Sequence, residues 1–120
     1  RELNRRAALD VYQPDAALCG GITGVARIAA LVQADGAWFS PHTWSNGIGL
    51  MANLHLACAV SKCPFLEFPF DPPAWTTERR DYILQPQDRL MLDTDGYLQV
   101  PEKPGLGCEL DEGALARYAI

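Results

Sequence analysis

The sequence lacks the features that mark several large classes of protein. Its 120 residues carry a formal net charge of −5, and the 10 lysines and arginines are scattered, with no basic stripe. This distribution argues against the electrostatic footprint of a nucleic-acid-binding protein. No apolar run approaches the roughly 18 residues that a membrane span requires. We therefore expect neither a nucleic-acid partner nor a membrane partner.

The cysteines are few and irregularly spaced. Cys19, Cys58, Cys63 and Cys108 form no C-x-x-C pair, and each lies among apolar or small residues. A free cysteine in such surroundings behaves as a small hydrophobic residue. The pattern argues against a zinc site and a disulfide framework, and it fits a reducing compartment, so we expect a cytoplasmic protein. The sequence also has no low-complexity tract.

The first half of the chain alternates short extended runs with helical patterns. Extended runs occupy residues 11–13, 37–40 and 64–69. Helical spacing of apolar residues begins at Ile22, with Thr23 as the expected N-cap, and ends at Gly36; a second helix is expected from Ile48 to Val60. Alternation of this kind favours parallel strands with right-handed crossovers, so the predicted fold class is α/β.

The second half is less regular. Residues 71–95 combine prolines and charges with little periodicity. At the other end of the chain, residues 1–9 resemble the last turns of a helix. Asp95-Gly96 is a turn signal before a strand predicted at residues 97–100. Asp111 is an N-cap candidate for a closing helix at residues 112–118.

Three ionisable residues occupy equivalent places at the three predicted strands of the first half. Asp15 and His42 each follow a proline at a strand end, and Glu67 lies inside the third run. In a parallel sheet their side chains would converge at the carboxyl edge, where such folds place their chemistry. A histidine can exchange a proton near neutral pH, and a neighbouring aspartate can fix its tautomer.

Glu67 lies between apolar residues, which could keep it protonated as a hydrogen-bond donor. Each of the three residues also has a plain structural interpretation. Asp15 could be a turn or N-cap residue, His42 a loop histidine with a satisfied hydrogen bond, and Glu67 a salt-bridged strand end. Their joint placement favours chemistry over these alternatives.

Several motifs, in order along the chain, resemble the C-terminal region of the enolase superfamily. The nearest branch is the mandelate racemase group, which includes acid-sugar dehydratases. The motifs are Gln13-Pro14-Asp15, Gly20-Gly21-Ile22-Thr23, Pro41-His42, Leu66-Glu67, Val100-Pro101 and Pro104-Gly105-Leu106-Gly107.

The resemblance implies the C-terminal part of a modified TIM-type (β/α)7β barrel, with strands 6–8 and their helices in this chain. Residues 1–96 would form the barrel segment, and residues 97–120 the return strand, the PGLG loop and the closing helix. We expect a fragment, about the last third of an enzyme, without the capping domain and first barrel strands. Three strands without their neighbours would leave an apolar face uncovered. We expect that face at Phe39, Leu50, Met51, Leu54 and Phe65, and we expect the isolated fragment to be unstable or to associate.

The resemblance also implies a chemistry. Enzymes of this family bind Mg²⁺ and remove the proton α to a substrate carboxylate. By position, His42 matches the general base or acid, Asp15 its dyad partner, and Glu67 the acidic residue that hydrogen-bonds the substrate carboxylate. Thr43, Trp44 and Asn46 would line the loop above the substrate.

The family's metal carboxylates and its opposite-face lysine lie on earlier strands, so no metal ligand is predicted in this chain. Asp10, Asp71 and Asp81 do not substitute for those carboxylates. The long loop at residues 69–81 favours a sugar-acid dehydratase, which would act on a small-molecule carboxylate. A racemase or epimerase of a 2-hydroxy acid and a non-catalytic barrel fragment are the alternatives. The complete protein is expected to be a homo-oligomer, and the isolated fragment to be inactive.

Overall fold

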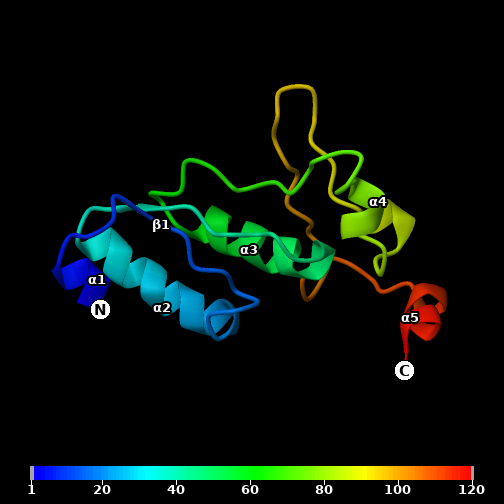
Figure 1. Ribbon diagram of the computed structural model, residues 1–120, viewed down its shortest axis with the longest axis horizontal. Helices are drawn as coiled ribbons and strands as arrows, with labels where there is room; N and C mark the ends of the chain where they lie inside the picture. The colour runs from blue at the N-terminus through cyan, green and yellow to red at the C-terminus, as the bar shows by residue number, and fades with distance from the viewer. Residues whose placement is uncertain (1, 120) are drawn as a thin grey trace.

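The first half of the chain folds as alternating strands and helices, as predicted, except that the third expected strand is not formed. The computed structural model describes residues 2–119. Figure 1 shows the two longest helices, α2 and α3, lying beside each other, with α4 and α5 at the end of the molecule opposite α1. The elements are α1 (Glu2–Arg5), β1 (Val11–Tyr12), α2 (Gly21–Ala34), β2 (Trp38–Phe39), α3 (Gly47–Ala59), α4 (Thr77–Arg80), the 3₁₀ helix η1 (Pro86–Asp88) and α5 (Glu112–Tyr118).

The strands β1 and β2 pair in parallel. Val11 lies opposite Trp38, and Tyr12 lies opposite Phe39. The intervening α2 packs against β2, which makes a βαβ unit of the kind predicted. Because the strands run in the same direction, the loops that follow Tyr12 and Phe39 leave the sheet at the same edge.

The third predicted strand, residues 64–69, is not formed as a strand. Phe39 donates its backbone N–H to Lys62, but the next bonds to this segment come from side chains. The Ser40 hydroxyl donates to the Phe65 carbonyl. Pro41 has no N–H to continue a backbone ladder, which explains why the segment lies beside the end of β2 without regular pairing.

The helix α3 matches the prediction at both ends to within one residue and is buried on more than one side. Its Leu56 belongs to a core cluster with Tyr12 and Phe39. Its Leu50 and Leu54 belong to a second cluster that includes segments from the second half of the chain. The helix therefore joins the two cores, as a helix that is apolar nearly all round is expected to do.

The start of α2 differs from the prediction. The helix begins at Gly21, and its N-cap is Gly20, not Thr23. Gly20 has a φ of 86° and makes no side-chain capping bond. A left-handed residue at this point turns the chain into the helix, and glycine adopts that conformation without a steric penalty.

The predicted uncovered face is wrong for four of its five residues. Phe39 is buried in the first cluster, between residues of the first half of the chain. Leu50, Met51 and Leu54 are buried in the second cluster, because the second half of the chain folds over α3. Phe65 is 76% exposed.

The second half contains more structure than its weak periodicity suggested, since α4 and η1 both lie within residues 71–95. The strand predicted at residues 97–100 is reduced to one antiparallel bridge, Leu92 to Leu98. The Asp95-Gly96 turn is formed, with Gly96 at a φ of 83°. Asp111 caps α5, as predicted, by accepting from the Ala114 N–H. None of the helices within residues 2–119 is both long enough and apolar enough to cross a membrane.

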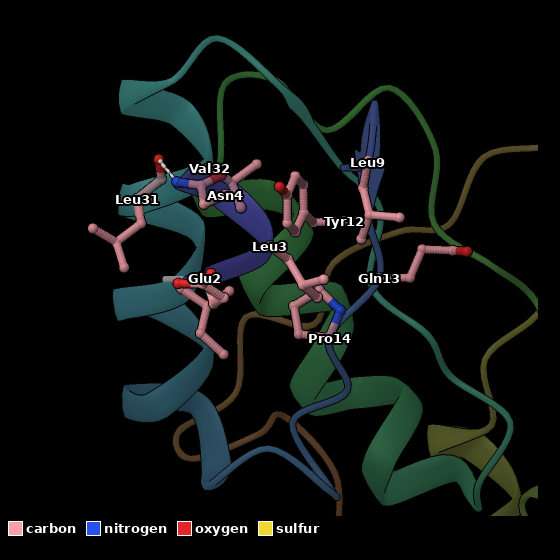
Figure 2. Close-up of a pocket in the computed structure, with 10 residues that line it drawn as sticks. Glu2, Leu3, Asn4, Leu9, Tyr12, Gln13, Pro14, Leu31 and Val32 are labelled. Atoms are coloured by element: carbon pink, nitrogen blue, oxygen red, sulfur yellow. Dashed lines mark hydrogen bonds between the residues drawn. The ribbon is translucent and has the colours of Figure 1, made fainter. Parts of the chain in front are cut away.

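A cavity of about 530 Å³ lies between α1, β1 and α2. Figure 2 shows Leu3, Leu9 and Tyr12 around it, and Asn4 donating to the Leu31 carbonyl. Its lining is mainly apolar and includes none of the three residues predicted to be catalytic. The cavity is therefore separate from the candidate site.

Candidate functional site

The parallel pairing of β1 and β2 brings Asp15 and His42 together. Asp15 lies three residues after Tyr12, and His42 lies three residues after the paired Phe39. The His42 Nδ1 atom is 3.0 Å from Asp15 Oδ2. The Asp15 side chain is 2% exposed, whereas that of His42 is 40% exposed. The two residues thus form a pair with a buried carboxylate and an accessible imidazole.

The environment of Asp15 favours its ionised form. Burial alone raises the pKa of a carboxyl group, but hydrogen bonds from His42, Asn53 and the Ala17 backbone outweigh burial and lower the pKa of Asp15 below its ordinary value. The Ala17 N–H donates to Oδ1 at 2.8 Å, and Asn53 Nδ2 donates to the same oxygen at 2.9 Å. Oδ2 then accepts from His42.

This arrangement determines which histidine nitrogen is free. An ionised carboxylate can only accept hydrogen bonds, so the proton between the two groups lies on His42 Nδ1. In the neutral ring the other nitrogen, Nε2, then carries a lone pair and can take a proton. The imidazolium that would result is stabilised by the neighbouring carboxylate.

Glu67 is held beside the residues that follow His42. The Thr43 N–H donates to Oε2 at 2.8 Å, and Trp44 Nε1 donates to Oε1 at 3.0 Å. The Thr43 hydroxyl also donates to the Glu67 backbone carbonyl. Each oxygen of the Glu67 carboxyl group thus accepts one hydrogen bond, and the two residues that follow His42 hold this side chain in position.

The three predicted substrate-binding residues occupy different environments. Thr43 is fully buried, and its N–H and hydroxyl both bind Glu67. Asn46 is the N-cap of α3, and its side chain accepts from the Gly49 N–H at 3.2 Å. Trp44 is 45% exposed, and its ring centroid lies 6.1 Å from that of Trp75. Of the three, Trp44 presents the largest accessible surface, while the bonds of Thr43 and Asn46 hold the loop in place.

Asn53, which lies on α3 and is fully buried, was not predicted to belong to the site. It donates to Asp15, to the His42 carbonyl and to the Gly49 carbonyl, and it accepts from the Ala16 N–H. The available signal was a strongly polar residue inside a helix that otherwise packs on both sides. Buried amides need hydrogen-bond partners, so such a residue points to a polar site nearby.

The described residues offer no metal centre. Within 2–119, no group of three or more histidine, cysteine, aspartate or glutamate side chains could hold a metal ion. Asp81 is fully buried and forms a two-pronged ion pair with Arg80, with both N···O distances at 2.7 Å.

Comparisons with known proteins extend this description. Residues 1–114 match the family model "Enolase C-terminal domain-like". The arabinonate dehydratase of Saccharolobus solfataricus is 32% identical over 117 residues, which are 98% of this chain and 29% of that protein. The D-galactarolactone cycloisomerase of Agrobacterium fabrum is 30% identical over 114 residues, which are 94% of this chain and 30% of that protein.

Solved structures show the same similarity. A mandelate racemase/muconate lactonizing enzyme-like protein from Rubrobacter xylanophilus superimposes with a TM-score of 0.79 and 36% identity, over 98% of this chain and 29% of the other. A member of the enolase superfamily from a Polaromonas species gives a TM-score of 0.84 and 28% identity, over 99% of this chain and 30% of the other. The chain spans less than a third of the length of these relatives.

The match of the family model to nearly the whole sequence confirms the α/β fold class and the resemblance drawn from the motifs. The fold is that of part of the C-terminal barrel, although the third of its expected strands is extended without regular pairing. The chain belongs to the enolase superfamily, of which it carries an enolase C-terminal domain-like segment.

Proposed function

We propose that the complete protein is a sugar-acid dehydratase and that the His42–Asp15 pair performs its proton transfer. The observation that carries this proposal is the 3.0 Å contact between an accessible imidazole and a buried carboxylate at the carboxyl edge of a parallel strand pair. Three relatives of the chain support the proposal, since they are named arabinonate dehydratase, D-xylonate dehydratase and L-rhamnonate dehydratase.

The proposed step begins with substrate bound against His42. Nε2 takes the proton from the carbon α to the substrate carboxylate, and Asp15 stabilises the resulting imidazolium. The β-hydroxyl takes this proton from the His42 imidazolium and leaves as water, and the enol that remains rearranges to a 2-oxo acid. In the alternative assignment, a base elsewhere in the complete protein removes the α-proton, and His42, as the imidazolium, gives its proton to the departing hydroxyl.

Glu67 is proposed to bind the substrate carboxylate. A substrate anion close to Glu67 would place two like charges together, which favours protonation of one of them. Glu67 in its acid form could then donate a hydrogen bond to the substrate, while Thr43 and Trp44 keep the side chain in position. The exposed face of Trp44 is proposed to contact the apolar C–H side of the sugar acid.

The metal and the domain arrangement are also proposals. Family membership supports Mg²⁺ as cofactor, and since the described residues do not provide a metal site, its ligands would belong to other parts of the complete protein. We propose that residues 1–96 complete a barrel with those parts and that residues 97–120 return towards a capping domain. The free thiols at all four cysteines agree with a cytoplasmic location. A homo-oligomer is proposed for the complete protein.

An isomerase is the second candidate. The cycloisomerase relative and the racemase-like structures support it, because isomerisation can share the same first step of proton removal. A non-catalytic barrel fragment is the third alternative, and the same assay excludes it if any turnover depends on His42.

The test is turnover of a panel of sugar acids by the complete protein with Mg²⁺, performed in heavy water. A dehydratase yields a 2-oxo acid, and the His42→Asn variant yields none. A racemase or epimerase yields deuterated substrate and its epimer without the oxo acid. If a folded, Mg²⁺-loaded protein gives neither product nor exchange on any acid of the panel, the proposal fails.

A further inference from the structure

Asn53 is an unusual residue for its position. It lies in the middle of α3, is fully buried and is surrounded by helix positions that pack into the two cores. Burying an amide is unfavourable unless its donors and its acceptor find partners. The partners it has therefore indicate why an amide occupies this position.

The amide orientation follows from those partners. The oxygen Oδ1 accepts from the Ala16 N–H at 3.0 Å. The nitrogen Nδ2 faces three oxygens, which are Asp15 Oδ1 at 2.9 Å, the Gly49 carbonyl at 3.0 Å and the His42 carbonyl at 3.1 Å. A flipped amide would place an oxygen against three acceptors and a nitrogen against a donor, so only one orientation satisfies the site.

One side chain thus links both members of the proton-transfer pair. The amide nitrogen of Asn53 bonds the carboxylate of Asp15 and the backbone of His42, while its oxygen bonds the residue that follows Asp15. The two loops that leave β1 and β2 are therefore held to the same rigid group on α3. The separation between carboxylate and imidazole depends on this group as well as on the sheet.

We propose that Asn53 is a positioning residue for the His42–Asp15 pair. With Asn53 and the Ala17 N–H on Oδ1, the carboxylate cannot rotate freely, and Oδ2 is directed at His42 Nδ1. Asn53 thereby keeps the proton on Nδ1 and the lone pair on Nε2. The role of Asn53 in turnover rests on the proposed function, but its effect on the tautomer of His42 does not.

The test compares Asn53→Leu and Asn53→Asp in the complete protein. Leucine has a similar size but no polar group, and aspartate keeps the acceptor for Ala16 but replaces the donor to Asp15 by a negative oxygen. Nitrogen NMR of isotopically labelled histidine reports the tautomer, with His42 assigned by its loss in His42→Asn. We expect the Nδ1–H form of His42 in the wild type and a mixture of tautomers in both variants.

Kinetics give the second readout. Loss of an outer partner of a catalytic group typically costs about 10- to 100-fold in activity, so kcat should fall by that amount while KM changes little. The same substitutions in an Asp15→Asn background should cost much less, because Asn53 acts through Asp15.

Leu54→Ala is the matched control for a general loss of helix packing. Leu54 is the next residue on α3, is buried in the second cluster and makes no bond to the pair. This variant should be destabilised but keep the wild-type tautomer of His42. If the Asn53 variants fold and keep that tautomer, the positioning proposal is wrong. If the tautomer shifts but no sugar acid is turned over by the wild type, the positioning role stands and the proposed function fails.

Discussion

The Nδ1 atom of His42 lies 3.0 Å from the Oδ2 atom of Asp15, although the residues are 27 positions apart in the chain. Two short strands produce this contact, because their parallel register places both residues at the same distance beyond the sheet. The buried member is a carboxylate with a lowered pKa, and the accessible member is an imidazole. This combination is suited to the uptake and release of a single proton at the His42 imidazole.

Replacing His42 by asparagine should abolish most of the turnover of the complete protein. Asparagine keeps a hydrogen-bonding group of similar size but cannot exchange a proton, so the expected loss in kcat is about 10²- to 10⁴-fold. Mg²⁺ affinity, measured by calorimetric titration, should stay nearly unchanged. Asp15→Asn should impair the same step, and the two losses should not add, because the residues act as a unit.

His55→Gln is the control for this prediction. The second histidine bonds the Leu106 carbonyl through Nε2 at 3.0 Å, which ties α3 to the PGLG loop. Its replacement should lower stability by about 1 kcal/mol and leave kcat within a few fold of the wild type. If His42→Asn is as active as His55→Gln on the same substrate, then His42 has a structural role only.

The sequence predicted the parts of this site that depend on local patterns. Proline at strand ends and the alternation of strands and helices placed Asp15 and His42 at one edge, and the contact between them is present. The prediction of a third strand at residues 64–69 was wrong, because Pro41 lacks the N–H that a backbone ladder with this segment requires. The prediction of Thr23 as the N-cap of α2 was wrong, because the left-handed Gly20, and not a side-chain cap, precedes that helix.

Long-range partners were beyond prediction from one sequence. Asn53 bonds a residue 38 positions away, and nothing in its local pattern states which group that is. Arg80 and Asp81 lie in the segment whose sequence shows little periodicity, and both are fully buried. Charged and amide groups are buried only when specific partners satisfy them, and those partners are fixed by the tertiary fold.

The Asp88–Lys103 pair should give stability a defined pH window. A hydrogen bond from Lys103 lowers the pKa of Asp88, and the same bond raises the pKa of Lys103. The Asp88 contribution is complete above its unfolded pKa of about 3.9 and is lost as pH falls through the lower folded pKa. The Lys103 contribution is complete below its unfolded pKa of about 10.4 and is lost as pH rises through the higher folded pKa.

Urea unfolding of the complete protein across pH measures this window. Lys103→Met should reduce the loss of stability at both ends of the pH range relative to the wild type. Lys62→Met serves as the control, because Lys62 donates to the Gly36 carbonyl and not to a carboxylate. Identical pH profiles for Lys103→Met and the wild type would show that the pair does not contribute.

Alanine should be tolerated at Gly49 but not at Gly47, although both begin α3. A Cβ atom at Gly47 would lie 2.5 Å from Asp81 Oδ1 and 2.7 Å from Leu84 Cδ1. Neither neighbour can move easily, because Arg80 holds the carboxylate and Leu84 is fully buried. Gly47→Ala should therefore destabilise the protein by about 1–3 kcal/mol in denaturant unfolding.

At Gly49 the added methyl group would instead meet the side chain of Ser45. The Ser45 hydroxyl has no hydrogen-bond partner among residues 2–119, so it can rotate away, and the Ser45 Cβ, 3.2 Å from the added methyl group, needs only a small shift. Removing a glycine from a helix gains up to about 1 kcal/mol, so Gly49→Ala should be near neutral. Equal unfolding midpoints for Gly47→Ala and Gly49→Ala would mean that the Asp81 side chain moves to make room for the methyl group and is not fixed in position.

The ion pair between Arg80 and Asp81 should be costly to break and much less costly to remove. Both side chains are fully buried, and Arg80 also donates to the carbonyls of Leu90 at 2.6 Å and Pro69 at 3.3 Å. Arg80→Met leaves a buried carboxylate without its partner, for which the expected loss is about 3–5 kcal/mol. Arg80→Lys keeps the charge but not the planar fork, so an intermediate loss is expected.

The double variant Arg80→Met/Asp81→Leu decides the origin of this loss. If the penalty comes from an unpaired buried charge, the double variant should be more stable than Arg80→Met alone, as measured by denaturant unfolding. Arg79→Met is the matched control, since Arg79 is the exposed neighbour in the same helix. It loses only an exposed bond to the Ala74 carbonyl and a contact with the Trp75 ring, so the expected change is about 1 kcal/mol. Strictly additive losses in the double variant would instead assign the role of Arg80 to its bonds with the two carbonyls.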